Sequence, residues 1–285
     1  MGRIICSFKN ANLSMQEQKG ICIKEGIDLL SVDRYDDKSL LEISKDEILE
    51  FKKKDVEVAA LESMIGYKDF DDDLEEAEKI FSLAKESKIK MVICYGYFPF
   101  ENNDKLINHF TNLADMAKKN GIQLLIRNHS KTNFNSADKL LELVTTVNRP
   151  NFKVLFDTKE FIKNNEIIMP AYRHLKKEIG AIYINDSIGD FNTPIGMGEG
   201  NIIEFLKILE NDDYKGNYFI DLDFNAYLKR EKKYREFNPF KVFSKEYKII
   251  RMIDEKLEKK KNDKVTYSYL ASLQLRYLKH IIKKK

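Results

Sequence analysis

Short apolar segments alternate with longer segments of helical periodicity along the chain. Eight of the apolar segments are typical of β-strands, because they are short, rich in aliphatic and aromatic residues, and bounded by polar turns. They are Arg3–Phe8, Leu29–Asp33, Val56–Glu62, Met91–Tyr95, Leu124–Asn128, Lys153–Asp157, Ala181–Asn185 and Tyr218–Asp223. Several, such as the run MVICY, are apolar at nearly every position. This pattern indicates strands buried on both faces, as in a parallel sheet covered by helices.

The segments between these strands carry the start and stop signals of helices. Ser14 and Ser136 are candidate N-caps, since a serine hydroxyl accepts a hydrogen bond from the first helical turn. Gly26 and Gly121 follow two of the helical patterns, in the position that ends many helices. Further helical patterns begin after Asp73, Asp104 and Asn201.

A regular βα alternation predicts a parallel sheet, and eight units favour a closed barrel over an open sheet. No G-x-G-x-x-G follows the first strand, which removes the main support for a dinucleotide-binding fold. We therefore predict an α/β fold, a single-domain (β/α)8 TIM barrel with an extra C-terminal helix.

The end of the chain departs from the minimal barrel pattern. A helix over 244–260 is expected to close the barrel, and one over 267–283 is expected to be the extra element. The division would be 1–262 for the barrel and 263–285 for the extension, which would pack through Leu270, Leu273, Leu278 and Ile281. The basic stretch Lys229–Arg235 is typical of a solvated helix face.

Composition narrows the classes of partner. Lysine and arginine number 49 and aspartate and glutamate 46, with the two signs interspersed, so no global field favours nucleic acid. The three cysteines have neither disulfide nor zinc spacing, and no apolar run is long enough to cross a bilayer. These features predict a cytoplasmic protein that binds neither nucleic acid nor membrane. The extra C-terminal helix could mediate a dimer or simply cap the barrel, so the expected assembly is a monomer or a homodimer.

Polar residues collect where the predicted strands end, and in a βα barrel these ends meet at one face. Glu62 ends the third strand, and the fifth ends in the run IRNHS, with Arg127 and His129. Later strand ends contribute Asp157, Lys159, Glu160, Tyr183, Asn185, Asp186, Asp221 and Asp223. Several carboxylates at one mouth repel one another unless a metal ion or a fixed arginine or lysine lies among them.

These strand ends resemble those of the xylose isomerase-like barrel superfamily, which includes sugar phosphate isomerases and epimerases and endonuclease IV. The resemblance is carried by GIQLLIRNHS, KVLFDTKEF, IYINDS, PIGMGEGNIIEFLKIL and KGNYFIDLDF, in that order along the chain. The most specific piece is the glycine run of Pro194, Gly196, Gly198 and Gly200.

The resemblance implies a divalent metal (Mn, Mg, Co or Zn) held by glutamate, aspartate, histidine and glutamate at strands five to eight. Asp157 matches the aspartate, and Asp223 stands for the last glutamate. Arg127 and Tyr183 replace the other two ligands, which argues against a metal because arginine cannot lose its proton to become a ligand. We expect Arg127 to replace the cation and to bridge Asp157 to Glu160 or to Asp223.

The resemblance implies a sugar or sugar-phosphate isomerase or epimerase that transfers a proton next to a carbonyl. The candidate catalytic residues are Glu62, Glu160 and Asp223. The candidates for binding a small carbohydrate are Arg127, His129, Lys159, Tyr183, Asn185 and Asp186. The alternative is a non-catalytic sugar-binding or regulatory barrel that has lost its metal. A nuclease of the endonuclease IV type needs a histidine-rich metal cluster, and the chain has 4 histidines, mostly in helical patterns.

Overall fold

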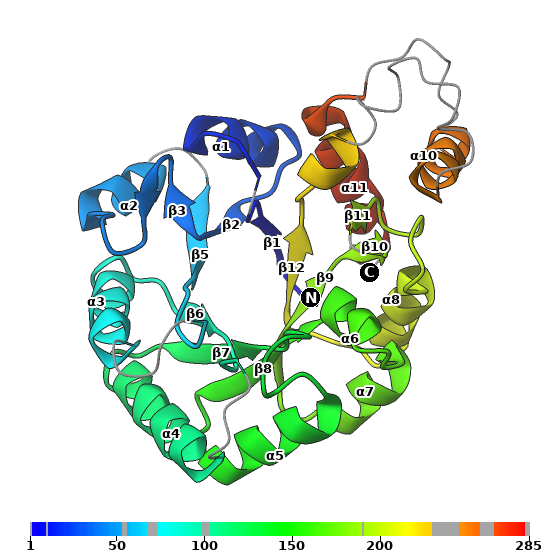
Figure 1. Ribbon diagram of the computed structural model, residues 1–285. Coiled ribbons are helices and arrows are strands. Elements are labelled where there is room, and N and C mark those ends of the chain that lie inside the picture. Colours follow the sequence, from blue (N-terminus) through cyan, green and yellow to red (C-terminus); the bar gives the residue numbers. More distant parts are fainter. Residues whose placement is uncertain are drawn as a thin grey trace.

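Eight parallel strands close into a barrel in the computed structural model (Figure 1). The structure describes residues 2–9, 11–52, 56–67, 73–98, 103–189, 191–229, 245–256 and 265–282. The barrel strands are β1 (Ile4–Ser7), β2 (Leu29–Val32), β5 (Glu57–Glu62), β6 (Met91–Cys94), β7 (Gln123–Arg127), β8 (Phe152–Asp157), β9 (Ile179–Ile184) and β12 (Asn217–Asp221). Each predicted strand is present within two residues of its predicted bounds, and the predicted fold class is confirmed.

Each strand pairs with its neighbours in chain order, and β12 pairs with β1 to close the ring. Two small hairpins were not predicted, β3 (Arg34–Tyr35) with β4 (Lys38–Ser39), and β10 (Asp186–Ile188) with β11 (Phe191–Thr193). Both follow barrel strands directly. They are too short for an alternating pattern to reveal them.

Helices form an outer ring around the strands in Figure 1. They are α1 (Met15–Lys24), α2 (Lys45–Lys52), α3 (Asp73–Glu86), α4 (Asn103–Lys119), α5 (Ala137–Val147), α6 (Thr158–Lys163), α7 (Ile168–Leu175), α8 (Ile202–Asn211), α10 (Lys245–Lys256) and α11 (Tyr267–Ile282). The caps at Ser14 and Ser136 are confirmed, since each hydroxyl accepts from a backbone N–H of the first turn. No described helix combines the length and the apolar character that a membrane span requires.

The core has two layers, as expected for strands buried on both faces. Inside the barrel, side chains from alternate strand positions pack together, and these include Ile5, Ile93, Leu125, Tyr183 and Phe219. Outside it, a larger apolar layer joins the strands to the helices. The inward alternation continues past the apolar interior to the ends of the strands, and it therefore decides which polar side chains reach the mouth of the barrel.

The extra C-terminal helix is present, but its place in the ring differs from the prediction. α11 lies between α1 and α8, because Arg276 pairs with Glu25 and Ile281 shares a surface pocket with Leu209. α11 therefore takes the position that the sequence pattern gave to the segment 244–260.

The buried residues of α11 also differ in part from the predicted ones. It contains Leu270, Leu275 and Leu278, whereas Leu273 is only half-buried. Most of the basic stretch Lys229–Arg235 lies outside the described residues.

Candidate functional site

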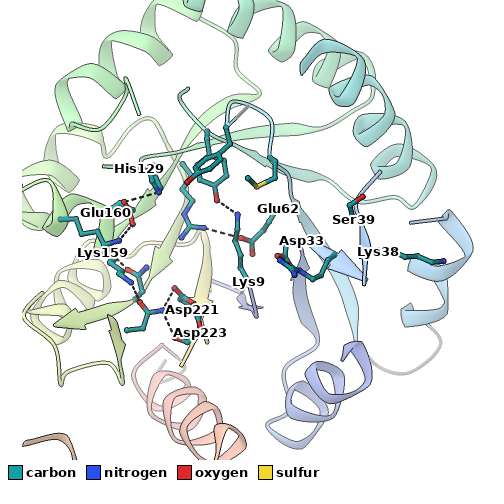
Figure 2. A pocket seen from close by; sticks show the side chains of 18 of the residues that line it. Lys9, Asp33, Lys38, Ser39, Glu62, His129, Lys159, Glu160, Asp221 and Asp223 are labelled. Atoms are coloured by element: carbon teal, nitrogen blue, oxygen red, sulfur yellow. Dashed lines mark hydrogen bonds and ion pairs between the residues drawn. The ribbon is translucent and has the colours of Figure 1, made fainter. Parts of the chain in front are cut away.

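A cavity of about 690 Å³ opens at the C-terminal ends of the barrel strands. Seven of the predicted site residues line it, Glu62, Arg127, His129, Lys159, Glu160, Asn185 and Asp223. In Figure 2, Glu62 and Lys9 lie on one side of the cavity, and Lys159 and Glu160 lie on the other. Its size is within the range of pockets that enclose a small molecule.

Arg127 lies at the base of this cavity and pairs with two carboxylates, one from the neighbouring strand β8 and one from β5, two strands away. Its Nε and Nη2 atoms lie 2.7 and 2.6 Å from Oδ2 of Asp157, and Nη1 lies 3.6 Å from Oε2 of Glu62. The guanidinium carbon is 3.8 Å from the centre of the Tyr183 ring. The predicted contact with Asp157 is present. The second partner is Glu62, not Glu160 or Asp223.

Glu62 is held from below by two serine hydroxyls. Its Oε1 atom accepts from Ser7 at 2.6 Å and from Ser31 at 2.5 Å. Because Ser7 gives its only hydroxyl hydrogen to Glu62, the 2.7 Å contact between Ser7 and Tyr183 has Tyr183 as the donor. Oε2 of Glu62 is buried and accepts no hydrogen bond from the described residues. One oxygen is thus fixed, and the other faces Arg127.

Asp157 is buried, and its two oxygens are already occupied. Oδ2 accepts from Arg127, and Oδ1 accepts from the backbone N–H of Lys159 and from the amide of Asn185. Asp157 is also the N-cap of α6. The carboxylate therefore orients Arg127 and begins a helix, and it does not line the cavity.

Glu160 and His129 form a second polar group on the opposite wall. Burial raises the pKa of Glu160, but hydrogen bonds from the Ser130 N–H and hydroxyl, with His129 and Lys163 nearby, outweigh burial and lower the pKa to about 2. Burial lowers the pKa of His129, which favours a neutral imidazole. A carboxylate with so low a pKa is a weak proton acceptor at neutral pH.

Asp221 and Asp223 lie on a third side, where β12 ends. Asp221 accepts from the backbone N–H of Asp223 and from the amide of Asn192, whose oxygen in turn accepts from Lys159. Burial raises the pKa of Asp221 to about 6, and it raises the pKa of Asp223 as well. Asp221 continues the inward alternation from Phe219, whereas Asp223 reaches the cavity from the loop after the strand.

Two predicted substrate-binding residues do not line the cavity. Tyr183 is buried beneath Arg127 as part of the barrel interior. Asp186 is buried and accepts from the backbone N–H groups of Gly196, Gly198 and Gly200. The glycine run thus encloses a carboxylate of the same chain, and this placement argues against a direct substrate contact for Asp186.

Other residues that line the cavity were not among the predicted site residues. They include Lys9, Asp33, Tyr67, Tyr95, Asn192 and Asp221. Inward alternation from Ile5 through Ser7 points to Lys9, and alternation from Phe219 points to Asp221. Asn192 belongs to the β10–β11 hairpin, for which the sequence carries no signal.

The donor set at the base of the cavity does not fit a divalent cation. Arg127 lies between the two carboxylates that would be the nearest oxygen ligands, and a guanidinium repels a metal ion. In the described part of the chain, no three histidine, cysteine, aspartate or glutamate side chains come together as a metal site requires.

Comparisons with known proteins give a family model and structural relatives. The family model described as xylose isomerase-like TIM barrel matches residues 22–236. No curated protein matches the chain. Similar solved structures include an L-ribulose 3-epimerase, with 15% identity and a TM-score of 0.70, covering 99% of this chain and 95% of that one.

Two further structures show the same fold. A D-psicose 3-epimerase from Clostridium cellulolyticum H10, solved with D-tagatose, has 14% identity and a TM-score of 0.68, and 99% of each chain is covered. The IOLI protein, solved with a bound zinc atom, has 17% identity and a TM-score of 0.66, with 90% of this chain and 96% of that one covered. At such identities the likeness establishes the fold alone.

Proposed function

The chain belongs to the xylose isomerase-like TIM barrel family, and from this premise we propose that it is a sugar or sugar-phosphate isomerase or epimerase. In this proposal a proton is transferred next to a carbonyl, and Arg127 replaces the metal cation. The similar solved structures with known sugar substrates include L-ribulose and D-psicose 3-epimerases, which supports a carbohydrate as the ligand. The size of the cavity is suited to such a molecule.

The observation that carries the proposal is the pairing of Glu62 with Arg127. Enolisation needs a base for the carbon-bound proton and a positive group for the oxygen that gains charge. Glu62 has one oxygen fixed by Ser7 and Ser31, and its other oxygen accepts no hydrogen bond from the described residues. Arg127 lies 3.6 Å away and carries a permanent charge. The base and the cation thus lie side by side without a metal.

The remaining cavity residues take supporting roles in the proposal. Lys159, His129 and Asn185 offer hydrogen bonds to the hydroxyl groups of a sugar. Glu160, with its low pKa, acts as a fixed anion for Lys163 and His129 and not as the base. Asp221 and Asp223, on the third side of the cavity, are the carboxylates available as the second proton carrier that an epimerase needs.

Proton exchange tests this proposal directly. A panel of ketoses and ketose phosphates is incubated with the protein in D2O with EDTA, and loss of the proton next to the carbonyl is followed by NMR. Glu62→Gln is expected to lower exchange at least about 100-fold, because general base catalysis contributes about 10²–10⁴-fold. Glu160→Gln should lower it less than about tenfold. A larger loss in Glu160→Gln than in Glu62→Gln would assign the base to Glu160.

The metal content tests the role given to Arg127. Elemental analysis of the purified protein is expected to find no stoichiometric Mn, Mg, Co or Zn, and EDTA is expected to leave exchange unchanged. One equivalent of any of these metals, released together with activity by a chelator, would refute replacement of the cation by Arg127.

A non-catalytic sugar-binding or regulatory barrel is the second candidate function. It is favoured by the same ion pairs, because Asp157 and Glu62 balance the charge of Arg127 and so have a structural role that requires no catalysis. Saturable binding of a sugar without exchange of any proton, with and without added metals, would establish this alternative.

The cell location and assembly state remain part of the proposal. Cys6, Cys22 and Cys94 are free, buried thiols, which supports a reducing compartment such as the cytoplasm. We retain a monomer or homodimer, and sedimentation velocity would distinguish the two.

A further inference from the structure

The hydroxyl of Tyr95 has a neighbour that fixes which way its hydrogen points. Tyr95 directly follows β6, and its ring continues the inward alternation of Met91 and Ile93 to the wall of the cavity. Lys9, two residues beyond the end of β1, reaches across the barrel, and its Nζ atom lies 2.5 Å from the Tyr95 oxygen. The two residues come from opposite ends of the first half of the barrel and meet only in the folded state.

Lys9 can only donate in this contact. Burial lowers its pKa, but the neighbouring Tyr95 and Glu62 outweigh burial, and the pKa is raised overall. Lys9 is therefore an ammonium at neutral pH, with hydrogens to donate and no lone pair to accept with. The Tyr95 oxygen must be the acceptor, so its own hydrogen points elsewhere.

No described residue takes that hydrogen. The hydroxyl of Tyr95 makes no other hydrogen bond within the described part of the chain, and its ring lines the cavity. The ring is held in place by edge contacts, with centroids 5.2 Å from Tyr67 and 6.0 Å from His129. The result is an oriented O–H donor directed into the cavity.

This donor lies in the electrostatic neighbourhood of the proposed base and cation. Lys9 is close enough to Glu62 for that carboxylate to raise its pKa, and Tyr95 and Arg127 line the same cavity. A hydrogen-bond donor backed by an ammonium is stronger than a phenol alone, because the charge is felt through the shared oxygen.

We propose that the Tyr95 hydroxyl holds the carbonyl oxygen of the substrate while Glu62 removes the proton from the neighbouring carbon, with Lys9 as the positioning residue. The inference rests on the proposed function and adds the group that binds the reacting oxygen. The ligand class is a ketose or another α-hydroxy carbonyl compound. The cavity then offers the oxygen two donors, Tyr95 and Arg127.

The step balances without an oxidant or a reductant. The proton goes to Glu62, the C–H electron pair forms the C=C bond of the enediol, and the carbonyl π pair moves to oxygen. That oxygen takes the Tyr95 proton or shares it in a strong hydrogen bond. In the reverse step Glu62 returns its proton to carbon, and Tyr95 recovers its own.

Binding of a planar enediolate mimic tests the oxygen site apart from turnover. The probe is glycolohydroxamate, titrated by calorimetry in the presence of EDTA so that metal chelation cannot contribute. Tyr95→Phe is expected to bind it at least about tenfold more weakly than the wild type, since one charge-assisted hydrogen bond is lost. Tyr277→Phe is the control, because it removes a hydroxyl from an exposed tyrosine of α11 that does not line the cavity. It should bind within about threefold of the wild type.

Equal binding by Tyr95→Phe and the wild type, or equal weakening in both variants, would overturn the assignment. So would a wild-type protein that does not bind the mimic at all. The proposed reaction has its own readout in proton exchange. Exchange that Tyr95→Phe leaves unchanged refutes the role of Tyr95 but not the reaction. Absence of exchange, with binding still dependent on Tyr95, refutes the reaction but leaves the oxygen site.

Two substitutions at Lys9 separate positioning from structural support. Lys9→Arg keeps a group that can only donate, and it should keep binding of the mimic within about threefold. Lys9→Gln introduces an amide oxygen that accepts the Tyr95 hydrogen and turns it away from the cavity, so binding should fall by about the same factor as in Tyr95→Phe. If both variants bind equally well while remaining folded, Lys9 does not position Tyr95.

Discussion

Arg127 is enclosed by groups that fix both its charge and its direction. Two nitrogens of its guanidinium contact Asp157, and the third faces Glu62. The Tyr183 ring lies against the guanidinium. A buried guanidinium is costly unless carboxylates balance it, and Asp157 and Glu62 supply that balance here. The arrangement explains how this barrel buries several acidic residues close to one another at its mouth.

Asp221 gives a prediction at the residue scale. Burial raises its folded-state pKa to about 6, above its ordinary value of 3.8. The folded protein therefore binds this proton more tightly than the unfolded chain, and the contribution of Asp221 to stability falls as pH rises from about 4 to about 6. The fall is expected to be about 2–3 kcal/mol.

Urea denaturation of the wild type and Asp221→Asn at several pH values between 4 and 7 measures this contribution. The difference in the free energy of unfolding between the two proteins should change with pH over the range in which Asp221 titrates. The variant also places an amide NH2 opposite that of Asn192. This contact shifts the free energy of unfolding by an amount that does not depend on pH. A difference that stays flat over the whole range would show that the Asp221 pKa is ordinary.

The β10–β11 hairpin and the glycine run form a single unit at the element scale. Asp186 begins β10, and its carboxylate accepts from Gly196, Gly198 and Gly200. The hairpin carries Asn192 to the cavity, where its amide bridges Lys159 and Asp221. The glycine run therefore serves the site indirectly, by fixing the base of the hairpin, and its N–H groups are not free for a phosphate.

Gly198→Ala tests this unit. A Cβ atom at this position would lie 2.0 Å from Oδ1 of Asp186 and 2.6 Å from the Ser187 nitrogen, so carboxylate or backbone must move. We expect a loss of at least about 2 kcal/mol in the free energy of unfolding. Gly20→Ala is the matched control, because its Cβ meets nothing within 4 Å in the middle of α1. It should gain about 0.5–1 kcal/mol from helix propensity.

Chemical denaturation of both variants measures these changes in the free energy of unfolding. If Gly198→Ala were as stable as the wild type, the close packing of the glycine run around Asp186 would be wrong.

At the scale of the whole molecule, α11 joins the two ends of the chain and reaches the site. Arg276 pairs with Glu25 at the end of α1. Gln274 accepts from the backbone of Ile195 and donates to the carbonyl of Asp221, at 3.2 and 2.7 Å. The C-terminal helix thus closes the helical ring and also supports the strand end that carries Asp221.

Two neighbouring leucines test the orientation of α11. Leu275 is fully buried and Leu273 is half-buried. Leu275→Ala is expected to destabilise the protein by about 2–5 kcal/mol, as for other buried leucines, and Leu273→Ala by less than about 1.5 kcal/mol. Unfolding curves of the two variants measure the difference. A larger loss at Leu273 would restore the helix orientation that the sequence pattern predicted.

The eight strands could be predicted because each is a short apolar run between polar turns, and tertiary burial agrees with the local pattern. The missed features are those without a local pattern. The two hairpins are two or three residues per strand, and the buried face of α11 mixes Gln274 with leucines, which shifted the predicted stripe. Lys9 was missed because inward alternation was not extended past the last apolar residue of its strand, and Asp221 was placed at the mouth of the barrel but given no role in the site.

The sequence by itself determined the barrel, its family resemblance, and the place of the site at the strand ends, because hydrophobic periodicity is local and barrel topology follows from the order of elements. Only the tertiary structure decided the partners within the site. It paired Arg127 with Glu62 rather than with Glu160 or Asp223, enclosed Asp186 in the glycine run, and brought Lys9 to Tyr95. Hydrogen bonds and ion pairs act over a few ångströms, and residues 10 to 86 positions apart meet at that range only where loop conformation, strand register and barrel closure bring them together.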